Sequence, residues 1–335
     1  MGLITCTNVV KKFGSFTALD NINLDIPEGK IFGFLGPNGA GKTTLIRIIN
    51  RITLPTEGQV LFNGKELRLS DIEKIGYLPE ERGLYKKMKV GEQAVYLAML
   101  KGLSKGEATR ELMKWFQKFG IQPWWNRKVE ELSKGMAQKI QFITTVLHNP
   151  KLLILDEPFS GFDPINVNLI KDEILRMKDE GCSIILSTHN MESVEELCDE
   201  IALINKAKLV ISGSVDKIRS EYGHNRVEIL FSGATNAADA AGEAADSESQ
   251  APTDVEGLFT VLSTEKVKDE FRSVLELAPG VTHNDVMSAL IKQVNLDSYQ
   301  KLMPKMSEIF IKLVGESGGA TSQSIDDYRK AHGGK

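Results

Sequence analysis

Residues 36–44, Gly-Pro-Asn-Gly-Ala-Gly-Lys-Thr-Thr, constrain the possible fold most strongly. They match the pattern G-x-x-x-x-G-K-[ST] and lie between the apolar residues 31–35 and a further apolar stretch that starts at Leu45. A strand, a glycine-rich turn and a helix start in this order direct backbone N–H groups and the positive end of the helix dipole at one anion. We therefore predict a phosphate-binding loop, and the alternative is a glycine turn that only caps a helix.

The side chains of this loop suit a nucleotide. Gly36, Gly39 and Gly41 allow the backbone to approach a ligand closely. Lys42 supplies a positive charge for the β- and γ-phosphates, and the Thr43 hydroxyl supplies a hard oxygen ligand for magnesium.

Two acidic residues follow a second apolar run. Residues 152–155 predict a strand, and Asp156 and Glu157 end it before Pro158 starts a turn. Asp156 is well placed to hold magnesium, and Glu157 to polarise an attacking water. Alone, this pattern fits a solvated acidic strand end equally well. The glycine loop upstream favours the catalytic interpretation.

Two further features have both an ordinary and a functional explanation. Ser133 is a good N-cap and Gly135 permits close backbone approach, so this helix start can bind a phosphate or can simply be a capped helix. The helix has apolar residues on one face at Met136, Ile140, Ile143 and Leu147. His189 follows an apolar strand at 184–186, where an isolated histidine is more often structural.

The composition excludes several classes of protein. The 41 basic and 45 acidic residues give a net charge of −4, with no basic footprint for nucleic acid. Cys6, Cys182 and Cys198 lack C-x-x-C spacing, which argues against disulfides or zinc and indicates packed, reduced thiols of a cytosolic protein. No leader is expected, and no run approaches the ~20 apolar residues that span a bilayer. A role at a membrane therefore requires a partner that spans it.

Strand and helix signals alternate along the first part of the chain. Strands are expected at 3–10, 21–26, 31–35, 58–62, 74–78, 152–155 and 184–186, and helices between 92 and 147 and over 165–178. Strands joined by long helical crossovers predict a parallel sheet with helices packed against it.

A second domain is expected beyond Tyr222. Residues 226–231, 258–262 and 271–277 predict strands, and 284–294 and 306–314 predict helices. Residues 232–256 hold acidic but no basic residues among many Ala, Gly and Ser, so we expect a flexible insertion there. Residues 316–335 are expected to form a polar tail.

The order of the motifs resembles that of the ATP-binding subunits of ABC transporters. Residues 36–44 resemble their Walker A loop, 132–136 their signature, 152–158 Walker B, 160–163 the D-loop and 187–189 the segment of the switch histidine. The resemblance implies an α/β P-loop NTPase fold of the ABC ATPase type over 1–222, with an antiparallel β subdomain and a helical subdomain at about 88–149.

The same resemblance implies residue roles, with ATP and Mg²⁺ as ligands. The catalytic residues are Glu157 as general base, His189 at the γ-phosphate and Lys42. ATP is bound by Phe13, Gly36, Asn38, Gly39, Ala40, Gly41, Lys42, Thr43, Thr44, Ser133, Gly135 and Asp163, and Mg²⁺ by Thr43, Glu80 and Asp156. Phe13 has the position of the aromatic residue that stacks on adenine, Phe16 is a weaker candidate, and either can instead belong to the core.

Some residues depart from the family pattern. Glu80 replaces a glutamine, which keeps an oxygen ligand for Mg²⁺ but adds a negative charge beside the γ-phosphate. Lys134 and Met136 replace Gly and Gln in the signature, so we expect function with altered strength.

The C-terminal part resembles one branch of the family. Residues 223–315 are similar to the small α+β domain of sodium-efflux (Nat-type) and drug-export ABC ATPases, and residues 77–85 also resemble that branch.

The resemblance implies a subunit that hydrolyses ATP and drives a separate membrane permease in export. One chain holds one set of motifs, so the second set must come from another copy or a paralogue. The permease is expected to dock at 85–89 and the helices that follow, with the chain in the cytoplasm on the inner face of the cell membrane and no nucleic-acid partner. The alternatives are a soluble ABC ATPase acting on ribosomes or DNA, and a regulatory module that binds ATP without hydrolysis.

Overall fold

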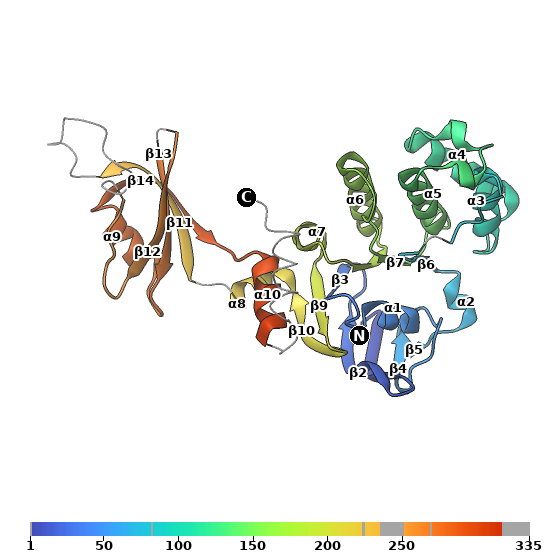
Figure 1. Ribbon diagram of the computed structural model, residues 1–335, viewed down its shortest axis with the longest axis horizontal. Coiled ribbons are helices and arrows are strands. Elements are labelled where there is room, and N and C mark those ends of the chain that lie inside the picture. The colour runs from blue at the N-terminus through green and yellow to red at the C-terminus, as the bar shows by residue number, and fades with distance from the viewer. Residues whose placement is uncertain (1, 82, 223–224, 235–250, 269, 317–335) are drawn as a thin grey trace. The chain divides into compact units, whose positions relative to one another are not determined.

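The computed structural model describes residues 2–81, 83–222, 225–234, 251–268 and 270–316. Two compact units are present, with elements labelled in Figure 1. The first unit contains the chain up to Val215 and the part that starts at Phe310, and the second contains Asp216–Ile309.

A six-stranded sheet forms the centre of the first unit. Its order is β10–β9–β3–β8–β7–β6, and all neighbouring pairs are parallel except β10 and β9. The strands are β3 (Ile31–Leu35), β6 (Ile75–Leu78), β7 (Leu152–Asp156), β8 (Ser183–Ser187), β9 (Glu200–Asn205) and β10 (Lys208–Ser214). Every residue of β3, β7 and β8 is buried, as in a sheet covered on both faces. The predicted parallel sheet is therefore confirmed.

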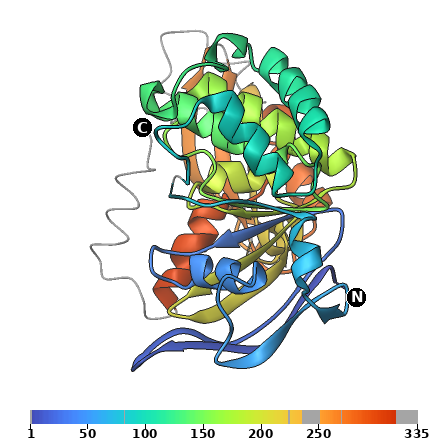
Figure 2. The ribbon, with the colours of Figure 1, turned by 90° about the vertical axis from the view of Figure 1, so that its right-hand side faces the viewer.

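Helices and a second sheet cover the two faces of this sheet (Figures 1 and 2). Helices α5 (Lys134–Val146) and α6 (Pro164–Asp179) lie on one side, and α1 (Lys42–Ile49) and the antiparallel sheet lie on the other. Apolar residues of both sheets and α1 form one buried core that includes Ile22, Phe34, Leu45 and Ile154. The short helices α2 (Leu69–Ile72) and α7 (Met191–Leu197) belong to the same unit.

The antiparallel sheet extends beyond its predicted strands. It consists of β1 (Ile4–Phe13), β2 (Phe16–Ile26), β4 (Glu57–Phe62) and β5 (Lys65–Glu66), in the order β2–β1–β4–β5. The prediction ended the first strand at residue 10 and began the second at 21, so it missed the tip of this hairpin. The tip pairs Phe13 with Phe16 across Gly14, and its side chains are exposed on both strands. No apolar alternation therefore marks it in the sequence.

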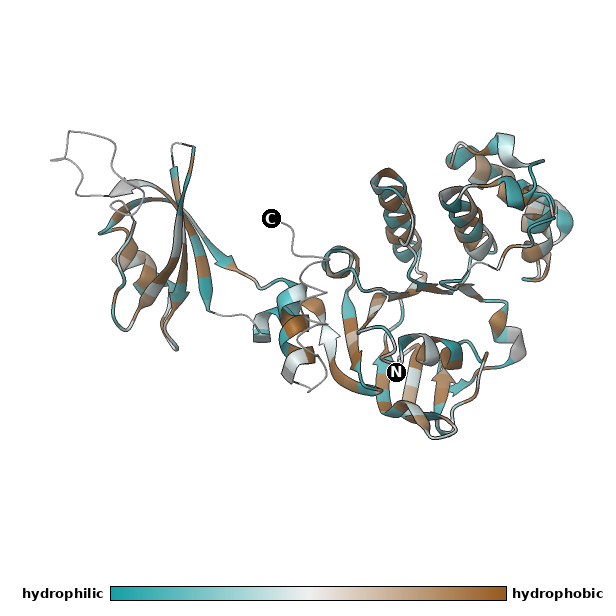
Figure 3. Cartoon of the chain, viewed as in Figure 1, coloured by the Kyte–Doolittle hydropathy of each residue, from teal (hydrophilic) through white to brown (hydrophobic). Residues whose placement is uncertain are grey.

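Three helices form a small subdomain where the sequence predicts helical structure. They are α3 (Val90–Met99), α4 (Lys105–Lys118) and α5, with short 3-10 helices at Gln122–Trp124 and Val129–Glu131. Aromatic rings contribute to their packing, with centroids 5.6 Å apart for Phe116 and Trp125 and 6.3 Å apart for Trp115 and Phe142. Figure 3 shows hydrophobic and hydrophilic residues side by side along these helices, as expected when one face is buried.

The second unit contains an antiparallel sheet of order β12–β13–β11–β14. Its strands are β11 (Arg226–Ala234), β12 (Phe259–Val267), β13 (Glu270–Leu277) and β14 (Val294–Leu302). Helix α8 (Val215–Tyr222) leads into the sheet, α9 (His283–Leu290) precedes β14 and α10 (Met306–Glu316) follows it. Val286 and Leu290 of α9 pack with Ile229, Phe231 and Leu275 of the sheet in a separate core.

The helix predicted over residues 284–294 is wrong at its C-terminal end. Helix α9 ends at Leu290, and β14 starts at Val294. Within the described residues this edge strand pairs only with β11, and it contains Asn, Asp and Lys, which are depleted in strands. Pairing with β11 determines the strand, and this pairing leaves no local signal in the sequence.

The predicted insertion at 232–256 has ordered ends. Residues 232–234 extend β11, the Thr253 N–H donates to Gln293 Oε1 at 2.8 Å, and the Val261 N–H donates to Asp254 Oδ1 at 2.6 Å. Asp254 and Gln293 therefore fix the return of the chain, and the prediction of one continuous loop is corrected there. Residues 235–250 and the predicted tail at 317–335 lie outside the described residues.

All three cysteines are buried free thiols, as the sequence predicts. They are Cys6, Cys182 and Cys198. Burial raises the pKa of each thiol to about 12, so almost none is present as the reactive thiolate near neutral pH.

Candidate active site

The loop after β3 has a backbone that requires glycine at two positions. Gly36 has φ 148°, and a Cβ atom there would lie 2.1 Å from the Ile204 carbonyl oxygen. Gly41 has φ 117°, and a Cβ atom there would lie 2.6 Å from the Ala18 carbonyl oxygen. Helix α1 begins directly afterwards, so the N–H groups of its first turn, which have no partner within the helix, adjoin the loop. This arrangement suits an anion.

A pocket of about 380 Å³ lies at this loop. Its wall includes these predicted site residues: Asn38, Gly39, Ala40, Gly41, Lys42, Thr43, Thr44, Glu80, Asp156, Glu157 and His189. Glu80 follows β6, the two acidic residues end and follow β7, and His189 follows β8. The carboxyl ends of neighbouring parallel strands meet at one edge of a sheet, and this brings residues far apart in sequence to one pocket.

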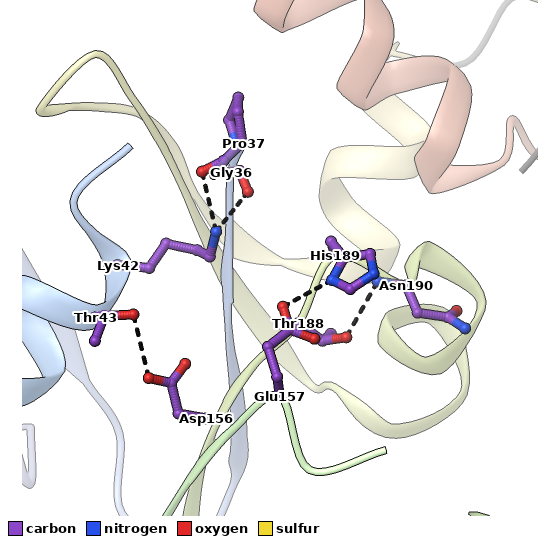
Figure 4. A network of polar contacts seen from close by, with 9 residues as sticks. All are labelled: Gly36, Pro37, Lys42, Thr43, Asp156, Glu157, Thr188, His189 and Asn190. Carbon is purple, nitrogen blue, oxygen red and sulfur yellow. Dashed lines mark hydrogen bonds and ion pairs between the residues drawn. The ribbon is translucent and has the colours of Figure 1, made fainter. Parts of the chain in front are cut away.

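Lys42 is buried within its own loop. Its Nζ atom donates hydrogen bonds to the carbonyl oxygens of Gly36 at 2.7 Å and Pro37 at 3.1 Å (Figure 4). Burial lowers the pKa of Lys42, and the nearby carboxylates of Glu157, Asp156 and Glu80 oppose this shift. The pocket thus holds a positive charge surrounded by negative ones.

Asp156 and Thr43 bring two hard oxygen atoms together. Thr43 Oγ1 donates to Asp156 Oδ2 at 3.2 Å (Figure 4). Burial raises the pKa of Asp156, which the Thr43 hydrogen bond partly counteracts. These oxygens, with Glu80 on the same pocket wall, fit Mg²⁺. Among the described residues no cluster of three or more Asp, Glu, His or Cys can hold a metal alone. When bound there, Mg²⁺ would neutralise negative charge on phosphate.

Glu157 and His189 form a direct contact. His189 Nδ1 lies 2.8 Å from Glu157 Oε1 (Figure 4). This hydrogen bond raises the pKa of His189, while burial and Lys42 lower it. Glu157 has φ 50°, and its N–H donates to the Ser187 carbonyl oxygen at 2.9 Å. The site therefore couples a carboxylate, able to accept a proton from water, with a histidine able to carry charge.

The predicted adenine-stacking residue lies outside the pocket. Phe13 is 53% exposed, and Lys11 Nζ lies 4.9 Å from the centre of its ring. Phe16, its neighbour across the hairpin, is 62% exposed and lines the pocket. The geometry therefore favours Phe16 over Phe13, because the β2 side of the hairpin tip faces the loop.

Ser133, Gly135 and Asp163 also lie outside this pocket. Ser133 caps α5 by accepting a hydrogen bond from the Met136 N–H at 3.3 Å, and Asp163 caps α6 by accepting one from the Asn166 N–H at 3.1 Å. Apart from its chain neighbours and the backbone of its own helix, no atom of the described residues lies within 4 Å of the Cβ position of Gly135. Packing within the chain thus does not explain a glycine at this position.

Comparisons with known proteins agree with this geometry. A family model described as ABC transporter matches residues 19–160, and one described as ATP-binding protein DrrA1-3-like, C-terminal domain, matches residues 213–314. The uncharacterized ABC transporter ATP-binding protein YhaQ of Bacillus subtilis is 52% identical over 68% of this chain and 76% of that protein. The chain belongs to the ATP-binding proteins of ABC transporters.

Two other similarities support this family assignment. The linearmycin resistance ATP-binding protein LnrL of Bacillus subtilis is 28% identical over 94% of this chain and 99% of that protein. A solved structure described as an ATP-binding subunit of an ABC transporter has a TM-score of 0.62 at 29% identity, over 66% of this chain and 93% of the other. The protein is an ABC ATPase with a DrrA-like C-terminal domain.

The pocket of this ABC ATPase contains three residues to which the sequence pattern assigns no individual role. They are Ala18, Ser160 of the segment that resembles the D-loop, and Ser187 of the segment that resembles the switch-histidine region; Phe16 is the weaker aromatic candidate. Ser187 is fully buried and pairs in register with Asp156 across β7 and β8. The sequence signal for Ser187 was its position directly after the predicted strand 184–186, just as Asp156 directly follows the predicted strand 152–155. Ala18 leaves no such signal, because the hairpin places it.

No helix within the described part of this ABC ATPase has the length and apolar character needed to cross a membrane.

Proposed function

We propose that this ABC ATPase powers export through a separate membrane permease, by ATP-driven association of two copies or of one copy with a paralogue. The observation that carries the proposal is the division of the predicted phosphate-binding groups. Lys42 and Thr43 line one pocket, whereas Ser133 and Gly135 lie outside it. A glycine with open space above it suits the close approach of a second chain's nucleotide.

The pocket residues account for hydrolysis of the terminal phosphate. Water attacks the γ-phosphorus while Glu157 accepts its proton, and the bond to the β-phosphate oxygen breaks to release ADP and phosphate. Lys42 and the N–H groups of the loop stabilise the phosphate charge, and His189 contacts the γ-phosphate. Thr43, Asp156 and Glu80 are the proposed oxygen ligands of Mg²⁺.

An apolar groove supports docking of a permease. The groove has a volume of about 330 Å³ and is lined by Ile52, Tyr77, Leu84, Leu97 and Leu100 among others. Ile52 and Leu100 are exposed, as is the neighbouring Tyr85. Apolar side chains exposed around a groove are typical of an interaction site. The ATPase then lies at the inner face of the cell membrane, held by its partner.

The C-terminal domain and the relatives favour an export substrate of the drug or antibiotic class. The relative that covers nearly the whole chain, LnrL, is described as a linearmycin resistance protein, and the C-terminal domain matches the DrrA-like model. Sodium efflux of the Nat type is the competing cargo, and it rests on the resemblance of residues 77–85 and of the C-terminal part.

Substitution of the general base tests the proposed function. We expect Glu157→Gln to abolish steady-state hydrolysis of Mg-ATP, since the amide cannot accept the proton, yet to accumulate an ATP-bound dimer. Turnover measurements and light scattering with ATP provide the readouts, and Lys42→Ala is the control that should lose both turnover and dimer. A wild-type protein with no turnover, even beside its permease, would instead indicate a regulatory ATP-binding module.

A further inference from the structure

Two side chains of α5 contact the turn at residues 158–161, which directly follows Glu157, the general base of the proposed function. We propose that Gln138, with Lys134 beside it, is a positioning residue that holds this turn and thereby links the start of α5 to Glu157 of the same chain. This role rests on the proposed function, in which Ser133 serves the ATP of the second copy while Glu157 serves the ATP of its own pocket.

Helix α5 contacts the turn through Lys134 and Gln138. Lys134 and Gln138 are four residues apart in α5, so they lie on one face of the helix. Gln138 Nε2 donates a hydrogen bond to the Ser160 carbonyl oxygen. The Cβ position of Gly161 would lie 2.6 Å from Lys134 Cε and 3.2 Å from Gln138 Oε1. The absence of a side chain at Gly161 therefore lets both side chains reach the backbone of the turn.

Ser160 of the turn is hydrogen-bonded to the backbone of Glu157. The Ser160 N–H donates to the Glu157 carbonyl oxygen at 3.2 Å, so the two polar groups of the Ser160 backbone have partners on opposite sides, Glu157 and Gln138. Ser160 also lines the pocket. A shift of α5 would therefore move Ser160, whose N–H is hydrogen-bonded to the Glu157 carbonyl oxygen.

The backbone of Glu157 itself has an unusual conformation. Its φ of 50° lies in a region that residues with a side chain rarely adopt, so it persists only while neighbouring contacts maintain it. The backbone contacts of Glu157 are the hydrogen bond from its N–H to the Ser187 carbonyl oxygen on β8 and the one that its own carbonyl oxygen accepts from the Ser160 N–H. Loss of the Gln138 contact removes one support of the turn that makes the second of these bonds.

This connection gives a role to Lys134, which replaces a glycine in the signature of the family. Lys134 stands directly after the Ser133 cap, where the family has a small residue, and its stem lies against Gly161. Ser133 and Glu157 lie on the same chain but face different nucleotides in the proposed dimer. Occupancy of one site therefore acts on the base of the other through Gln138 and Ser160.

Kinetics provide the first test. Gln138→Met keeps the length of the side chain and removes the donor. We expect kcat for ATP hydrolysis to fall about tenfold while the KM for Mg-ATP changes less than about twofold, because the base is misplaced but the phosphate loop is intact. Lys139→Met is the matched control, since the next residue points to another face of the helix, and it should keep the wild-type kcat.

Titration of His189 provides a readout that a merely structural contact would not change. The hydrogen bond of His189 to the Glu157 carboxylate raises the pKa of His189, so displacement of Glu157 returns that pKa toward its ordinary value. We expect NMR titration to give a lower His189 pKa in Gln138→Met than in the wild type and in Lys139→Met. Gln138→Leu, which also lacks the donor and adds no charge, replaces Gln138→Met if the latter does not fold.

The two readouts separate the positioning role from the proposed function. The role requires both a lower kcat and a lower His189 pKa, and an unchanged value of either one overturns it. If the wild type shows no turnover, the proposed function fails and the His189 titration alone decides: a shift supports the positioning role, and equal values overturn it.

Discussion

Glu157 combines the carboxylate that we propose as the general base with a strained backbone. Consecutive residues on a strand face opposite ways, so a regular continuation of β7 would direct Asp156 and Glu157 to opposite sides of the sheet. The positive φ of Glu157 ends the strand geometry, and both residues line the pocket. Such a conformation costs about 1–3 kcal/mol, which the hydrogen bond to Ser187 helps to offset.

The two aromatic residues at the hairpin tip give a prediction for nucleotide binding. We expect Phe16→Ala to weaken ATP binding by about fivefold or more, because stacking of a base on an aromatic ring contributes about 1–3 kcal/mol. Phe13→Ala should change the Kd by less than about twofold, since Phe13 does not line the pocket. Titration calorimetry with ATP measures both, and a larger loss in Phe13→Ala would restore the original assignment.

At the scale of elements, α3 and α4 each have glycine as their second residue, for different reasons. A Cβ atom on Gly91 of α3 would lie 2.5 Å from Trp125 Cε2, so the ring occupies the place of a side chain. Around the Cβ position of Gly106 in α4, the described part of the chain places no atom within 4 Å other than chain neighbours and the helix backbone. Close packing thus explains Gly91 and does not explain Gly106.

This contrast predicts opposite effects of the same substitution. Gly91→Ala should lower the free energy of unfolding by about 1–3 kcal/mol through overpacking against Trp125. Gly106→Ala should leave it unchanged or raise it by up to about 1 kcal/mol, because alanine favours the helix. Urea unfolding followed by tryptophan fluorescence measures both, and similar effects of the two substitutions would contradict the packing explanation.

The sequence predicts several of the elements whose causes are local. The buried strands β3, β7 and β8 follow from continuous apolar runs, and the phosphate loop follows from residues within one short motif. It does not predict β14, which depends on pairing with β11, or the side of the hairpin tip on which Phe16 meets the pocket. Partners distant in the sequence determine these features, so the local pattern carries no trace of them.

At the scale of the whole molecule, the site that we propose is composed of parts that one copy does not bring together. Pocket residues such as Lys42 and His189 gather at the carboxyl edge of the central sheet, while Ser133 stands at the start of α5 outside that pocket. In the proposed assembly each pocket is completed by the other chain, so activity belongs to the pair.

Mixed dimers test this division. Lys42→Ala damages the pocket and Ser133→Arg blocks the helix start, so each variant alone should be inactive. A mixed dimer has one intact site, formed by the pocket of the Ser133→Arg copy and the helix start of the Lys42→Ala copy. Equal mixing with random pairing should recover about one quarter of the wild-type sites, measured as ATP turnover. No recovery in verified mixed dimers would contradict the division.

The buried cysteines make the chain suitable for chemical labelling. Because each thiol has a pKa near 12 and is shielded by the core, maleimide probes should leave Cys6, Cys182 and Cys198 untouched in the folded protein. A Gly135→Cys variant, with open space around the new side chain, would then carry the one reactive group. A fluorescent label or cross-linker on this cysteine would report the approach of the second copy, without signal from the three native cysteines.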